Sequence, residues 1–154
     1  MERKDLQVTY LPIGELKSAE YNPRKWDKES SEQLKESLRR FGLVDPFVVN
    51  SAPERMNVII GGHFRWQMAK ELGFETVPVC YINIPDLEKE KELNLRLNKN
   101  LGEFDYGLLA EFDEAFLKDI GFDSEELDNI FEDDDNTEIF DLEKELKKLN
   151  IEEI

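Results

Sequence analysis

Residues 61–65 read Gly-Gly-His-Phe-Arg and lie between a short apolar run and a stretch with helical spacing. Two glycines between a strand and a helix let a ligand approach the backbone closely, and the N–H groups that open a helix attract phosphate. Arg65 adds a guanidinium, and His63 adds a further polar donor. A second interpretation is a tight turn in which Arg65 is solvated and His63 satisfies a local backbone group. The spacing alone does not decide between the two, because a Gly-Gly pair is a weak motif.

The elements that position this turn are predicted from hydrophobic periodicity. Period-two alternation and short apolar runs bounded by turn residues predict strands over 6–13, 46–50, 56–60 and 77–84. Helical spacing predicts a helix that opens with a capping box at Ser30, a helix that ends at Gly73, a helix over 87–101, and small helices packed on the core over 106–131. The second and third strands are expected to form a hairpin that leads directly into the turn.

Apolar residues at helical spacing mark one face on two of these helices. In the helix that follows Ser30, this face carries Leu34, Leu38 and Phe41. In the helix over 87–101, it carries three leucines spaced four residues apart, which are Leu93, Leu97 and Leu101. These faces predict how the two helices pack.

Length and composition exclude several classes of protein. The chain has 154 residues, of which 40% are apolar and 36% are charged, so it can bury one sizeable core. Its single cysteine, Cys80, allows no internal disulfide, and one cysteine with one histidine cannot form a Cys/His zinc site. No apolar run approaches the roughly 18 residues of a membrane span, and the N-terminus lacks the apolar stretch of a signal peptide. We therefore expect a cytoplasmic protein with no membrane contact.

The net charge of −16 lies entirely in the last third of the chain. Residues 1–101 carry 16 Lys+Arg and 16 Asp+Glu, whereas residues 102–154 carry 4 Lys+Arg and 20 Asp+Glu. A core to about residue 101 is therefore expected, followed by an acidic helical extension over 102–131, which completes a domain of residues 1–131. Residues 132–154 are expected to form an acidic linker and a short C-terminal helix. Such acidity opposes tight binding to a phosphate backbone and is typical of a partner surface.

Several ordered motifs resemble those of the ParB/sulfiredoxin superfamily. The turn at 61–65, with the strand before it and Ala-Lys-Glu-Leu-Gly after it, resembles the phosphate-binding motif of that superfamily. Upstream, residues 22–24 match an Asn-Pro-Arg box, and residues 41–49 match the family's helix end and following strand. Downstream, residues 96–105 resemble the third box, in the variant found where ParB-like domains accompany DNA methyltransferases. The resemblance covers residues 6–131.

This resemblance implies an α+β fold, with a ParB/sulfiredoxin-like small mixed sheet, surrounding helices and additional acidic C-terminal helices. It also implies a pocket for a nucleoside di- or triphosphate, either CTP or ATP/ADP, with Mg²⁺ as an accompanying ion. Carried over residue by residue, the phosphates would be held by Gly61, Gly62, His63 and Arg65. The second candidates are Arg24, Asn98 and Asn100, although such asparagines are also common helix or loop caps.

The sequence departs from two branches of this superfamily. Sulfiredoxin needs a nucleophilic cysteine at the position of His63, and Cys80 lies in a predicted strand where an inert thiol is expected, so sulfinate repair is not expected. Partition ParB proteins carry a second arginine where this chain has Phe64. The chain also lacks room for their helix-turn-helix and dimerisation domains. Centromere clamping is therefore not expected.

The leading hypothesis is a nucleoside-phosphate-binding ParB-like domain that works with DNA-modifying or DNA-handling partners, encoded by a phage or mobile element. Its acidic C-terminal third would bind a protein partner or a second copy of the chain, and DNA would be contacted indirectly. One alternative is a small kinase, NTPase or nuclease of the same superfamily, and another is an interaction module with a vestigial pocket. The catalytic residues of such an enzyme are not identified, and no metal-ligand set is recognised. Glu32, Glu36 and Asp45 are the nearest carboxylates, and a helix's solvent face and a turn cap account for them better.

Overall fold

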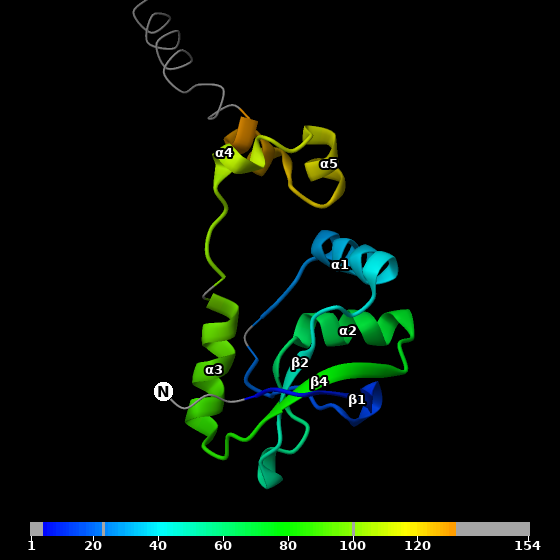
Figure 1. Cartoon of the computed structure of the whole chain (residues 1–154), viewed down its shortest axis with the longest axis vertical. Helices are drawn as coiled ribbons and strands as arrows, with labels where there is room; N and C mark the ends of the chain where they lie inside the picture. Colours follow the sequence, from blue (N-terminus) through cyan, green and yellow to red (C-terminus); the bar gives the residue numbers. More distant parts are fainter. Residues whose placement is uncertain (1–4, 23, 100, 132–154) are drawn as a thin grey trace, which may run out of the picture. The chain divides into compact units, whose positions relative to one another are not determined.

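The structure, a computed structural model, describes residues 5–22, 24–99 and 101–131 (Figure 1). The chain divides into two compact units with a boundary after Leu101. Within the described residues, no helix combines the length and apolarity that crossing a membrane requires. The linker and helix predicted over 132–154 lie outside this part of the chain.

The first unit contains a mixed sheet of four strands in the order β1-β4-β2-β3. The strands are β1 (Val8–Pro12), β2 (Phe47–Asn50), β3 (Ile59–Gly61) and β4 (Thr76–Ile82). Central β4 runs antiparallel to β1 and parallel to β2, and β2 is antiparallel to β3. All four predicted strands are present, and β2 and β3 form the predicted hairpin. Short 3₁₀ helices, Ile13–Glu15 and Pro53–Arg55, follow β1 and β2.

The main core lies on one face of this sheet. Alternate residues of the two central strands, Phe47, Val49, Val77 and Val79, are completely buried there. Burial of such side chains contributes roughly 1.5–3 kcal/mol each relative to exposure. Trp66 packs against them from the helix that follows the glycine turn.

Two helices form the next layer, α1 (Lys28–Phe41) and α2 (His63–Leu72), which lie side by side in Figure 1. They pack through Leu38 of α1 and Met68 and Ala69 of α2. The predicted capping box at Ser30 is wrong, because the Asp27 side chain caps α1 by accepting the Ser30 N–H at 2.7 Å. Aspartate caps as well as serine, so the polar run at 27–31 offered several equivalent starting points.

The predicted apolar face of α1 is correct for Leu34 and Leu38 but wrong for Phe41, whose side chain is exposed. Phe41 is the last residue of the helix, next to Gly42, whose φ of 77° turns the chain away.

Helix α3 (Leu87–Lys99) packs against β3 with a polar face. Glu90 and Asn94, one turn apart, are completely buried, whereas Leu97 and Leu101 of the predicted leucine face are exposed. The polar face of α3 is the buried one because it packs against a sheet edge and loops that present polar groups. For example, the Asn94 side-chain amide donates to the Ile60 carbonyl oxygen at 2.9 Å.

The second unit contains α4 (Tyr106–Leu109), α5 (Glu114–Asp119) and a helical segment over 124–131. These pieces have an apolar cluster of their own, made of Leu109, Leu117, Leu127 and Ile130. Asp123 and Glu126 cap the last segment reciprocally, with N–H to carboxylate distances of 2.8 and 3.0 Å. The predicted small helices are therefore present, and two acidic side chains cap the last one.

Candidate functional site

The turn between β3 and α2 is built around Gly62. Its φ of 112° is a backbone conformation that side chains with a Cβ rarely adopt. A Cβ at this position would also collide with the Phe47 ring and would lie 3.0 Å from Nη2 of Arg65. Gly62 precedes the first residue of α2, so the unpaired N–H groups of the first helical turn follow it directly. The predicted strand, glycine turn and helix are confirmed.

His63 is buried at the start of α2 and bonds to a distant segment. Its Nε2 accepts the backbone N–H of Ala19 at 3.0 Å. Burial, together with the nearby Arg24 cation, lowers the pKa of His63 to about 4. The ring is therefore neutral at pH 7 and carries its proton on Nδ1. His63 thus satisfies a backbone group, but in a distant segment and not locally as in the second interpretation. Its Nδ1–H is the donor that remains for a ligand.

Arg65 lies in the first turn of α2, with its guanidinium half-buried over the Phe47 ring at 5.3 Å. Nη2 donates to the Pro46 carbonyl oxygen at 3.2 Å, and Nη1 lies 3.7 Å from Oδ2 of Asp45. Nε is buried and has no hydrogen-bond partner among the described residues. Burial lowers the pKa of Arg65, but from so high a value that the guanidinium stays charged.

Arg24 reaches the same site from the segment that precedes α1. Its Nη1 donates to the side-chain oxygen of Asn98 on α3 at 2.9 Å. The Asn98 amide in turn donates to the Asn94 backbone carbonyl at 2.8 Å, which fixes its orientation. Trp26, two residues after Arg24, stacks on Phe64 of α2 with ring centroids 4.7 Å apart. Arg24 therefore attaches the segment 24–26 to α3, and Trp26 attaches it to α2.

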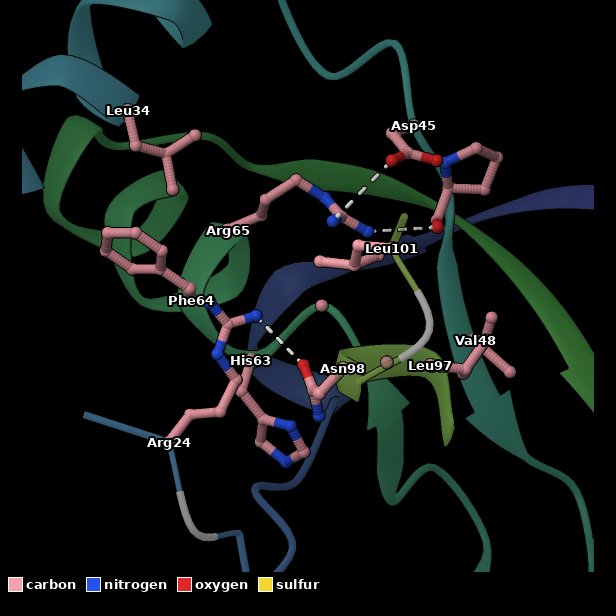
Figure 2. A pocket seen from close by; sticks show the side chains of 13 residues that line it. Arg24, Leu34, Asp45, Val48, His63, Phe64, Arg65, Leu97, Asn98 and Leu101 are labelled. Carbon is pink, nitrogen blue, oxygen red and sulfur yellow. Dashed lines mark hydrogen bonds and ion pairs between the residues drawn. The ribbon is translucent and has the colours of Figure 1, made fainter. Parts of the chain in front are cut away.

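These side chains surround one pocket of about 390 Å³ (Figure 2). Its lining residues come from five segments of the first unit and are Arg24, Leu34, Asp45, Pro46, Val48, Gly61, Gly62, His63, Phe64, Arg65, Leu97, Asn98 and Leu101. Six of the seven candidate residues, all except Asn100, are thus brought together, and Asn100 lies outside the described residues. The lining contains two guanidinium groups and one carboxylate, so it carries a positive charge.

A buried polar network supports one side of this region, and sequence analysis missed it. The Glu90 carboxylate accepts hydrogen bonds from Nε and Nη2 of Arg55, the Tyr21 hydroxyl and the Asn50 amide, at 2.6–3.0 Å. Burial alone would raise the pKa of Glu90, but these hydrogen bonds lower it below the ordinary value. The network fixes Tyr21, three residues before Arg24, to α3.

His63 gives the stability of the first unit a dependence on pH. Its pKa is about 4 in the folded chain and about 6.5 in the unfolded chain, so the unfolded state binds the additional proton. The stabilisation that comes from the neutral, buried His63 is complete above pH 6.5 and is lost as pH falls toward 4. From pH 7 to pH 5, we expect the unfolding free energy to drop by about 2 kcal/mol from this group. Urea unfolding at both pH values, with wild type and His63→Gln, measures it, and an equal drop in the variant would contradict the assignment.

Comparison with known proteins identifies the family. The family model described as the ParB N-terminal domain matches residues 2–101, and the chain belongs to this family. The predicted ParB/sulfiredoxin superfamily membership and α+β fold are therefore confirmed.

Two curated relatives show how the chain compares in length. The probable chromosome-partitioning protein ParB of Pseudomonas putida is 30% identical over 112 residues, which are 72% of this chain and 37% of that protein. The chain thus spans about a third of the length of the ParB relatives it matches. The ParB-like nuclease domain-containing protein YnaK of Escherichia coli is 32% identical over 87 residues, which are 56% of this chain and 95% of YnaK.

A solved structure shares the fold. The C-terminally truncated ParB of Caulobacter crescentus, complexed with CTP-gamma-S, aligns with a TM-score of 0.62 and 23% identity. The alignment covers 80% of this chain and 70% of that chain.

Proposed function

We propose that this chain is a ParB-like protein that binds a nucleoside di- or triphosphate in the pocket at the start of α2. One observation carries the proposal: two guanidinium groups and the N-terminus of α2, which follows Gly62, line the same pocket. The chain as a whole has a net charge of −16. A positive pocket in an acidic protein selects for a small anion that can enter it. The Caulobacter ParB, which shares the fold, was solved with a CTP analogue, so CTP is the first candidate and ATP or ADP the next.

The geometry supports separate roles for the candidate residues. Backbone N–H groups at Gly62 and the start of α2 would meet phosphate oxygens, with the Arg65 guanidinium beside them. Arg24 would close on the ligand from the opposite wall, where Asn98 now holds it. Nδ1–H of His63 would add a neutral donor, and Asn98 and Asn100 remain proposed contacts for the ligand or for its Mg²⁺ ion.

The acidic C-terminal third supports the second part of the proposal, a protein partner. Within 102–131, the side chains of Phe104, Leu108, Phe112 and Phe116 are exposed among acidic residues. Such a surface suits a partner with a basic, partly apolar face better than it suits DNA. We propose that DNA is reached through a DNA-modifying partner, that this surface can also serve self-association, and that a phage or mobile element encodes the chain.

The nucleotide proposal is tested by calorimetry and thermal shift with CTP, ATP and ADP, with and without Mg²⁺. Binding to the folded state raises the melting temperature by mass action. Arg65→Ala should weaken binding by about 1.5–3 kcal/mol, the range for hydrogen bonds to a charged group. Arg96→Ala is the matched control, because Arg96 is exposed on α3, pairs with Glu92 at 2.8 Å and does not line the pocket.

Three results would contradict this proposal. The first is that none of these nucleotides stabilises the wild type at millimolar concentration. The second is that Arg65→Ala binds as tightly as wild type, in which case the turn is purely structural. The third is an equal loss in Arg65→Ala and Arg96→Ala, which would indicate an effect of overall charge rather than of the pocket.

A further inference from the structure

The Arg65 guanidinium is incompletely neutralised in the structure. Among the described residues, its one ion pair is with Asp45 at 3.7 Å, its hydrogen bond is to the Pro46 carbonyl at 3.2 Å, and its buried Nε has no partner. Figure 2 shows both contacts on the same side of the guanidinium, where the segment that enters β2 passes. A half-buried cation with so few partners favours an additional anion.

Asp45 differs from the other acidic residues of the first unit because it lines the pocket. It is the one carboxylate among the pocket-lining residues, and its side chain is 72% exposed while one oxygen faces Arg65. A carboxylate presents a guanidinium with the same kind of acceptor as a phosphate does, namely charged oxygens. Asp45 therefore stands where an anionic ligand would make its contact with Arg65.

We propose that Asp45 is an internal counter-ion that holds Arg65 in the empty pocket and gives way to the phosphate of the ligand. This inference rests on the proposed function, and it makes Asp45 a residue that sets affinity and charge preference. The pair is long and exposed, so it is weak and exchangeable, whereas a phosphate oxygen can form a shorter charge-assisted hydrogen bond. Asp45 also repels the ligand's negative charge, and this repulsion increases with the number of phosphate charges.

The direction of the effect distinguishes this role from its alternative, in which Asp45 is a ligand of a phosphate-bound Mg²⁺ ion. A counter-ion weakens binding, so its removal strengthens it, with Mg²⁺ and without. A metal ligand strengthens binding, so its removal weakens it only when Mg²⁺ is present. Screening adds a second criterion, because the effect of an exposed carboxylate decreases with added salt.

The test is calorimetric titration of CTP and of inorganic tripolyphosphate into wild type, Asp45→Asn and Glu92→Gln, in Mg²⁺ and in EDTA. Glu92→Gln removes the same charge from α3, away from the pocket lining. We expect Asp45→Asn to bind both probes about three- to tenfold more tightly at low salt in either buffer, with a smaller gain at 0.5 M salt. Glu92→Gln should change affinity less than twofold, and all three proteins should melt at similar temperatures.

Each remaining outcome overturns the inference. If wild type binds CTP and Asp45→Asn binds equally, Asp45 is not a counter-ion, although the proposed function stands. If Asp45→Asn loses affinity only in Mg²⁺, Asp45 is a metal ligand. If Glu92→Gln gains as much as Asp45→Asn, the effect is one of net charge. If neither wild type nor Asp45→Asn binds either probe, the inference and the proposed function fail together.

Discussion

Glu90→Ala should destabilise the first unit by about 3–5 kcal/mol, the cost of breaking a buried ion pair from one side. The substitution leaves Arg55, whose side chain is 18% exposed, without its bidentate partner. It also removes the acceptor of the Tyr21 hydroxyl and of the Asn50 amide. Urea unfolding followed by tryptophan fluorescence measures the loss, since Trp66 packs on the core of this unit.

Glu88→Ala on the same helix is the matched control. Glu88 is exposed, and its ion pair with Lys91, one helical turn away at 3.6 Å, is exposed as well. The loss of this ion pair should cost less than about 0.5 kcal/mol. A second variant, Arg55→Met with Glu90→Leu, removes both charges and should cost less than Glu90→Ala alone. If Glu90→Ala were as mild as Glu88→Ala, water and Glu20, which already accepts from Nη1 of Arg55 at 2.9 Å, would be sufficient partners for Arg55, and the network would contribute little.

Gly62→Ala should cost about 2–4 kcal/mol and should abolish nucleotide binding. Two effects act together, the strain of a positive φ and the collision of the new Cβ with the Phe47 ring, which is itself completely buried. Gly73→Ala separates them, because Gly73 also has a positive φ, of 84°, but a Cβ there meets nothing within 4 Å. The control should therefore cost only about 1 kcal/mol and leave binding unchanged.

Unfolding curves and CTP titrations of the two alanine variants give this comparison directly. Equal destabilisation would mean that Phe47 moves aside at no cost and that backbone strain accounts for both losses. Retained binding in Gly62→Ala would show that the backbone at this turn does not approach the ligand.

The strands and the glycine turn could be predicted because their signals are local. Short apolar runs bounded by turn residues identify β2 and β3, and two glycines before a helical pattern indicate one kind of turn. The resemblance then supplied Arg24 and Asn98, which are 74 residues apart in sequence and meet in the structure through a hydrogen bond. Periodicity contains no information about such a pair.

The Glu90 network shows what periodicity cannot predict. Its members come from β2, from the 3₁₀ helix after it, from α3 and from the segment before Arg24, and each resembles an ordinary surface residue in its own sequence context. The leucine spacing of α3 was misleading for the same reason, since the face of a helix that is buried depends on what lies opposite. The sequence indicates only a turn cap at Asp45, and only the fold brings it to Arg65.

The hydrogen bond between Ala19 and His63 has a consequence for the order of folding. It joins residues 44 positions apart, and the pairing of β1 with β4 and the Tyr21–Glu90 bond join positions still farther apart. Contacts of long sequence separation form late, because a large loop must close before any of them is gained. The β2–β3 hairpin and α2 are local and can form early, and the Ala19–His63 and Trp26–Phe64 contacts need only α2. The Arg24–Asn98 and Tyr21–Glu90 hydrogen bonds form only once α3 is in place. We therefore expect the pocket wall formed by α3 to be added after the glycine turn. A nascent chain that ends before α3 contains the glycine turn without this wall.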